Sequence, residues 1–153
     1  MSAEERLREL DITLPPLPAP AGLYAPAVRS GMLLVVSGQV PLHEGKPMAT
    51  GKLGAGVSLE EGASLARQCA LQALAIVRAD AQSLDRVARV VRTAGYVASA
   101  NGFTDQSRVI NGASQLLLDI FGEAGRGARI AIGVAELPLG VPVEVEFVFE
   151  LWP

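Results

Sequence analysis

The chain has 153 residues, of which 50% are hydrophobic and 5% aromatic, and its formal net charge at pH 7 is −3. This length suits one domain with an aliphatic core, and the acidic balance excludes the basic stripe expected on a nucleic-acid-binding surface. A single Cys and a single His exclude a disulfide framework and a zinc site of the usual spacing.

The N-terminal segment MSAEERLREL is charged and lacks the apolar region of a signal peptide. No apolar run approaches the ~18 residues that cross a membrane, so a cytoplasmic protein without membrane contact is expected. Residues 2–10 are predicted to form a short charged helix, and the proline-rich LPPLPAPAG after them is predicted to be extended and draped over the domain. The expected division is an N-terminal leader over residues 1–19 and one domain over residues 20–153.

Hydrophobic alternation predicts two strands in the next part of the chain. The alternation is weak over residues 23–30, whereas GMLLVVSGQV is typical of a buried strand that ends at the turn-prone Ser37-Gly38. Residues 41–56 are rich in glycine and proline and are expected to form a long loop, and such loops in compact domains are often functional.

Two helices and three strands are predicted after this loop. Ser58 opens S-L-E-E, a capping box that starts the first helix, and residues 86–98 are expected to form a strand. Thr104 is expected to cap the second helix, which stops at Gly122, and two strands joined at residues 137–140 end the chain. This order predicts a single α+β domain in which two helices pack on one face of a mixed sheet. A charged fraction of only 19% predicts that part of its surface is buried between subunits.

The two closing strands carry isolated charges among aliphatic residues. Alternation places Arg129 on one face with Ala131 and Gly133, and Glu144 on one face with Glu146. A guanidinium beside two small residues predicts a pocket for a small anion, because its rigid fork of donors suits a carboxylate. The alternative is a surface arginine on a half-exposed strand. Glu144 would orient water or transfer a proton, or else is an ordinary exposed strand residue.

The spacing of these two charges favours a site shared between subunits. A tight hairpin at residues 137–140 would place Glu144 opposite position 133, four residues along the strand from Arg129. That separation is roughly 13 Å, which is too long for an ion pair. A pocket between subunits would bring both residues to one ligand.

Four other residues have side chains that could serve a site. Tyr24 lies in AGLYAP, where an aromatic ring would line a pocket or pack in the core. Asn111 is a poor helix former inside the second helix, a local conflict that suggests a polar task. Cys69 falls on the apolar face of the first helix and is expected to be inert packing, and His43 is assigned no role. No group of residues indicates a metal site, and GKLGAG lacks the Lys-Ser/Thr of a phosphate-binding loop.

Together these segments resemble the reactive intermediate deaminase family (RidA, also called YjgF) over roughly residues 20–151. GLYAPAV is similar to the stretch that carries the family tyrosine, SGQVP to the motif SGQ-x-P, and VINGAS to the helix that carries an asparagine. ARIAIGVAELPLGVPVEVEF resembles the C-terminal signature R-x-x-V-x(4)-LP-x(5)-E-x-E. In this signature Arg129 stands nine residues before Pro138 and Glu144 six residues after it.

The resemblance implies a chorismate-mutase-like (YjgF-like) fold, a homotrimer, and clefts between adjacent subunits. Arg129 would hold the carboxylate of a small 2-imino acid, and Glu144 would orient or deprotonate the water that attacks the imine carbon and releases ammonia. No cofactor is implied. The residues expected to line the cleft are Tyr24, Gly38, Asn111 and Ala131.

The chain departs from the family pattern at one position of this cleft. Many members carry a cysteine two residues after the arginine, where this chain has Ala131. If the thiol only lines the pocket, Ala131 enlarges the cavity and changes the substrate. If the thiol is needed for turnover, the protein is a non-catalytic or regulatory trimer that binds small carboxylates. RNA cleavage, attributed to some relatives, is the least favoured activity because the chain is acidic. The leader and residues 41–56 are further departures, which predict a divergent subgroup.

Overall fold

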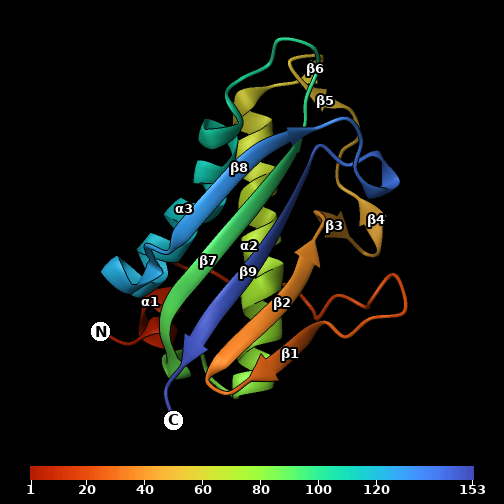
Figure 1. The fold of residues 1–153 in the computed structure, drawn as a ribbon. Coiled ribbons are helices and arrows are strands. Elements are labelled where there is room, and N and C mark those ends of the chain that lie inside the picture. The colour runs from red at the N-terminus through yellow and green to blue at the C-terminus, as the bar shows by residue number, and fades with distance from the viewer.

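The computed structural model describes residues 1–153 and has the predicted α+β architecture, a five-stranded mixed sheet with helices on one face (Figure 1). The strands lie in the order β1-β2-β9-β7-β8. β7 and β8 pair in parallel, and the other neighbours are antiparallel. The strand bounds are β1 Ala27–Ser30, β2 Leu33–Gln39, β7 Val87–Ala98, β8 Ala128–Val134 and β9 Val143–Leu151.

The two predicted helices, α2 (Leu59–Ala81) and α3 (Gln106–Phe121), pack against each other and cover one face of the sheet (Figure 1). A third helix, α1 (Ala3–Glu9), contacts α3 and the turn before β7. It adds Ala3 and Leu7 to the hydrophobic core. The short helix predicted over residues 2–10 is therefore present, and it joins a helix layer that was expected to contain only two helices.

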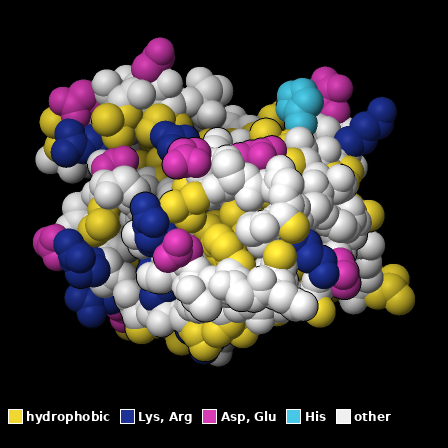
Figure 2. All heavy atoms as spheres, turned by 90° about the horizontal axis from the view of Figure 1, so that it is seen from above, with side chains coloured by type: hydrophobic (Ala, Val, Ile, Leu, Met, Phe, Trp, Pro, Cys, Tyr) yellow, Lys and Arg dark blue, Asp and Glu magenta, His cyan; other side chains and the backbone are white.

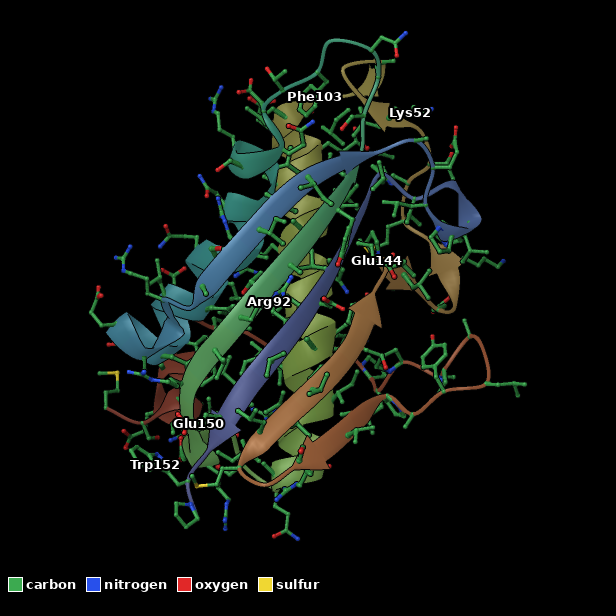
Figure 3. The ribbon with its side chains drawn as sticks, viewed as in Figure 1. Lys52, Arg92, Phe103, Glu144, Glu150 and Trp152 are labelled. Atoms are coloured by element: carbon green, nitrogen blue, oxygen red, sulfur yellow. The ribbon has the colours of Figure 1, made fainter.

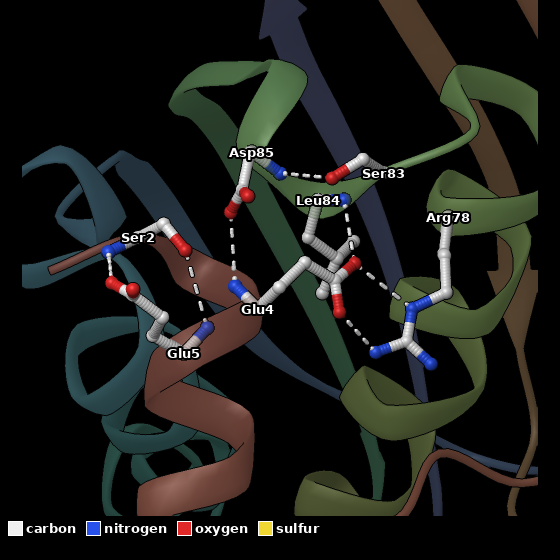
Figure 4. Close-up of polar contacts among 7 residues, drawn as sticks. All are labelled: Ser2, Glu4, Glu5, Arg78, Ser83, Leu84 and Asp85. Atoms are coloured by element: carbon white, nitrogen blue, oxygen red, sulfur yellow. Dashed lines mark hydrogen bonds and ion pairs between the residues drawn. The ribbon is translucent and has the colours of Figure 1, made fainter.

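α1 is fixed to the rest of the molecule by polar contacts (Figure 4). The carboxylate of Glu4 accepts hydrogen bonds from Arg78 Nε at 3.0 Å and from the Leu84 amide at 3.0 Å. The Glu4 amide donates to Asp85 Oδ1 at 2.9 Å. The first part of the expected leader is thus packed into the domain, whereas residues 12–20 after it contain neither helix nor strand, as predicted. A boundary at residue 19 stays a prediction.

The helix ends follow the predictions with two exceptions. Ser58 caps α2, its hydroxyl accepting from the Glu61 amide at 3.1 Å, but the return bond to the Glu61 carboxylate that would complete the predicted capping box is absent. Gly122 ends α3 with a φ of 59°. The expected Thr104 cap is wrong, because Asp105 precedes the first turn of α3 and makes no side-chain cap. Gln106 fixes this turn instead, donating from Nε2 to the Phe103 carbonyl at 2.9 Å.

Residues 41–56 are more ordered than the predicted long loop. They contain a small antiparallel pair, β3 (Leu42–His43) with β4 (Lys46–Pro47), which turns at Glu44 and Gly45. Both turn residues have positive φ angles, 50° and 76°, as a tight hairpin requires. β5 (Lys52–Leu53) and β6 (Gly56–Val57) form a second pair, so short backbone ladders organise this segment.

The core lies between the sheet and the helices, and the other sheet face is open. In β9 the predicted alternation is confirmed, because Val143, Val145, Phe147 and Phe149 are fully buried on the helix side. β2, predicted to be a buried strand, is buried on its helix side only, since no helix covers its second face. Leu33, Val35, Ile130 and Ile132, all on the open face, are between 39% and 44% exposed.

This open face is largely apolar. The register of β1, β2 and β9 places Val28, Val35 and Val148 side by side, and Ile130 and Ile132 extend the apolar surface along β8. Arg92 and Glu146 interrupt it on the central strands. None of the helices has the length and apolar character needed to cross a membrane.

Candidate functional site

Arg129 lies on the edge strand β8 and points toward α3. β8 pairs with β7 so that Arg129 stands beside Thr93, a residue on the helix side of the sheet. Its Nη1 donates to Asn111 Oδ1 at 2.8 Å and to Ser114 Oγ at 3.2 Å. Its Nη2 donates to Ser107 Oγ at 2.6 Å and to the Ser107 carbonyl at 3.3 Å. The guanidinium is therefore held by one face of α3.

These contacts position a positive charge without neutralising it. Four of the five guanidinium donors are used by neutral groups, and Arg129 forms none of the ion pairs in the structure. The Nε–H remains free. The Ser107 and Ser114 hydroxyls accept from the guanidinium, so each still has its own proton to donate. The result is a cationic group surrounded by donors, which suits an anion.

A pocket of about 280 Å³ lies directly against this guanidinium. It lies between α3, the turn over residues 125–127 and strands β7 and β8. Its lining residues are Thr93, Asn111, Ser114, Leu118, Gly125, Arg126, Gly127 and Arg129. No acidic residue lines it, so its electrostatic character is positive.

Two sequence expectations about this site have different outcomes. Asn111 does have a polar partner, because its side-chain oxygen accepts from Arg129. Ala131 and Gly133, however, do not border the pocket. Ala131 packs against the core, and a Cβ on Gly133 would lie 2.8 Å from Gln106 Nε2. The space beside the charge is therefore toward residues 125–127 and not above the small residues of β8.

Glu144, Gly38 and Tyr24 form a second group near the end of β2. Glu144 alternates with the buried Val143 and Val145, so it lies on the open face of the sheet, and Figure 3 shows it beside the end of β2. A Cβ built on Gly38 would be 2.8 Å from Glu144 Oε1. Burial raises the pKa of Glu144, and the nearby charge of Glu146 raises it further. A carboxyl group with a raised pKa is suited to general acid–base chemistry.

Tyr24 is half exposed in the segment before β1. Its hydroxyl accepts from the Ala21 amide at 3.2 Å. Tyr24 and Gly38 line a small cavity of about 40 Å³ together with the proline-rich segment over residues 18–21. The structure thus brings Tyr24 and Gly38 to one small cavity, and their role in lining a ligand cleft stays a prediction.

A buried amide network supports the strand end that carries Gly38. Gln72 of α2 donates to the Val40 carbonyl at 2.9 Å and to Gln39 Oε1 at 3.3 Å. It also accepts from the Leu42 amide at 3.1 Å. Because a buried amide is costly to leave unpaired, these contacts fix the path of residues 39–42 behind Glu144.

The two groups do not meet within one chain. β8 and β9 do not form a hairpin, because β7 lies between them. Glu144 is level with Tyr96 and Ile132, so it is displaced from Arg129 by two strand spacings across the sheet and three residues along it. The Cα separation is about 14 Å, and the two side chains point to opposite faces.

The sequence did not identify Ser107, Ser114 or Thr93. Ser107, Asn111 and Ser114 recur at the spacing of one helix face, a signal that becomes readable only when α3 is known to face Arg129. Cys69 is fully buried, and burial raises the pKa of its thiol above the ordinary value. The thiol is therefore unreactive packing, as expected.

Comparison with known proteins identifies the family. The family model described as "YjgF/chorismate_mutase-like, putative endoribonuclease" matches residues 4–151, from α1 to β9. The chain belongs to the YjgF family. Its fold is accordingly the YjgF/chorismate-mutase-like fold.

Three relatives illustrate the range of the similarity. Protein TCP17 of Trypanosoma cruzi is 49% identical over 146 residues, covering 95% of this chain and 91% of its own. The RutC family protein y4sK of Sinorhizobium fredii is 32% identical over 134 residues, covering 88% of this chain and 91% of its own. The crystal structure of Atu1372 from Agrobacterium tumefaciens, a protein of unknown function, is 42% identical and superposes with a TM-score of 0.89, covering 98% of this chain and 92% of its own.

Proposed function

We propose that this member of the YjgF family hydrolyses small 2-imino acids to 2-oxo acids and ammonia, with Arg129 binding the substrate carboxylate. The observation that carries the proposal is a guanidinium with no acidic partner, fixed by four hydrogen bonds beside an acid-free pocket. The free Nε–H and the hydroxyl of Ser114, which lines the pocket, are the donors that a carboxylate would use. Because they are already in place, little ordering is needed when the anion binds.

Glu144 is proposed to activate the attacking water from a neighbouring subunit. Within one chain it lies about 14 Å from Arg129 and on the opposite face, so one chain does not supply both groups to one small ligand. The apolar open face of the sheet supports an assembly, because exposed apolar surfaces of this kind usually mark interfaces. We propose a homotrimer in which Arg129 of one subunit and Glu144 of the next share a cleft.

The proposed chemistry balances without a cofactor. Glu144 accepts a proton from water as the water oxygen bonds to the imine carbon, and it passes this proton to the imine nitrogen. The tetrahedral carbon then forms a carbonyl as the C–N bond breaks, and the hydroxyl proton moves to the nitrogen, which leaves as ammonia. An imine is already electrophilic, so holding the carboxylate and the water in line contributes much of the rate enhancement. The raised pKa of Glu144 favours its action as the base.

The test is turnover of 2-aminoacrylate generated in the assay, followed by the release of pyruvate and ammonia. The wild-type protein should accelerate release over buffer, and Arg129→Ala should remove most of this acceleration. Gln115→Ala, a substitution on an exposed residue of the same helix α3, should leave the rate unchanged. Equal rates in buffer, wild type and Arg129→Ala would refute a deaminase.

Non-catalytic binding of small carboxylates is the second candidate. Two observations favour it: the Arg129 site is complete in one chain, and Ala131 occupies the position where many relatives carry a thiol. It predicts that 2-oxobutanoate raises the melting temperature by mass action, through Arg129, without any turnover. No shift at millimolar 2-oxobutanoate would count against this candidate.

RNA cleavage, which the wording of the family description suggests, has little support from the surface. The net charge is −3, and on the face shown in Figure 2 Lys and Arg side chains alternate with Asp and Glu without forming a basic patch. A strand of phosphates is bound mainly through clustered positive charge. The surface therefore offers RNA no extended basic patch, whereas the local positive charge at Arg129 is sufficient for one small carboxylate.

A further inference from the structure

The pocket beside Arg129 is also lined by a second arginine, Arg126. Arg126 has no role if the ligand has only one carboxylate. Arg126 lines this pocket in the turn that leads into β8. Its Nε and Nη2 donate to the Glu123 carboxylate at 3.0 and 3.2 Å. Its Nη1 makes no hydrogen bond within the chain. One edge of this guanidinium is therefore fixed while the other keeps two donors free.

A buried hydroxyl in the same pocket also lacks a partner. Thr93 is 3% exposed and lines the pocket, yet it takes part in none of the side-chain hydrogen bonds of the structure. No fully occluded side-chain oxygen or nitrogen is left unpaired, so the hydroxyl must open into the pocket. A buried hydroxyl without a protein partner gains from a polar ligand group.

The charge and size of the pocket match a small ligand with two acidic groups. Two arginines and no acidic residue line it. Its volume of about 280 Å³ is below the range of drug-sized sites. Residues 126 and 129 are three apart in the chain, which separates their Cα atoms by at most about 10 Å. Two long arginine side chains can therefore contact opposite ends of one short ligand.

We propose that this pocket receives the second carboxylate of a dicarboxylic ligand, with Arg126 and Thr93 as the residues that select it. This inference rests on the proposed function, in which Arg129 binds the first carboxylate. The substrate class is then a 2-imino dicarboxylic acid, and the product is a 2-oxo dicarboxylic acid. A reaction that oxidises the Cα–N bond of an acidic amino acid would supply such a substrate.

The test compares two ligands with the same five-carbon chain, 2-oxoglutarate and 2-oxopentanoate, by calorimetry on the assembled wild-type protein. Wild type should bind 2-oxoglutarate about tenfold more tightly, equivalent to about 1.4 kcal/mol. Arg126→Gln should abolish this preference and leave the affinity for 2-oxopentanoate unchanged. Thr93→Val, which keeps the branched shape, should weaken 2-oxoglutarate alone by a few-fold.

A matched variant should change the preference for 2-oxoglutarate in the opposite direction. Glu123→Gln removes the carboxylate that occupies Arg126 and should increase the preference for 2-oxoglutarate. Equal affinity of the wild type for the two ligands, or a preference that survives Arg126→Gln, would overturn the inference. If both ligands still bind through Arg129 in that case, the proposed function is retained. Binding of neither ligand would reject both together.

Discussion

Replacing Asn111 by alanine separates its role in the site from its role in the helix. Asn111 Oδ1 accepts from Arg129 Nη1 at 2.8 Å, and hydrogen bonds to charged groups contribute about 1.5–3 kcal/mol when buried. Arg129 is exposed, so the contribution to binding should be nearer about 1 kcal/mol. Affinity for 2-oxobutanoate should therefore fall about fivefold.

The stability of the same variant should change little. Alanine is a better helix former than asparagine by about 0.5 kcal/mol, which offsets the loss of one exposed hydrogen bond. We expect the free energy of unfolding, measured by urea titration at a fixed protein concentration, to stay within about 0.5 kcal/mol of wild type. Gln115→Ala, on an exposed position of the same helix, should leave the affinity unchanged. A large loss of stability with unchanged affinity would show that Asn111 is structural and refute the reasoning.

Three other substitutions give distinct outcomes. Glu146→Gln removes a charge that raises the pKa of Glu144, so Glu144 should remain a carboxylate at lower pH. The acid limb of the pH–rate profile should therefore shift to lower pH, and an unshifted limb would mean that Glu144 is not the base. Gly38→Ala would place a Cβ 2.8 Å from Glu144 Oε1 and should lower turnover while leaving ligand affinity intact, since the added Cβ displaces Glu144 and leaves the Arg129 contacts to the carboxylate in place; unchanged kcat would contradict this. Gln82→Gly should stabilise the protein by up to about 1 kcal/mol in urea titration, because Gln82 ends α2 with a φ of 70°; a lower midpoint would contradict it.

Local patterns in the sequence predicted the elements of this fold because each element depends on nearby residues. The alternation of valine and phenylalanine in β9 determines its buried face, and the Ser58 hydroxyl starts α2. The predicted cap of α3 was misplaced by one residue, because Asp105 takes the N-cap position without a side-chain cap and the first turn is fixed through the loop, by the bond from Gln106 to the Phe103 carbonyl. Such substitutions of one local contact for another depend on where the preceding loop lies.

The arrangement of the site could not be obtained in the same way. The insertion of β7 between β8 and β9 is a long-range pairing, and sequence neighbours at a predicted turn carry no signal of it. In the hairpin expected from the sequence, Arg129 and Glu144 would lie on the same face of two neighbouring strands. With β7 between β8 and β9, they lie on opposite faces of the sheet. The pocket likewise depends on Thr93 and Arg126, which lie 36 and 3 residues from Arg129 in the chain. Only the packing of α3 against the sheet brings them together.

Subunit complementation tests the central claim, that Arg129 and Glu144 act together across an interface. Arg129→Ala and Glu144→Gln should each be inactive toward 2-aminoacrylate when assayed alone. When the two variants are co-expressed in equal amounts, sites that pair an intact Arg129 with an intact Glu144 of the neighbouring subunit should form, and random mixing in a cyclic trimer gives about one quarter of the wild-type rate. No recovery in mixed assemblies verified to contain both variants would contradict the shared site.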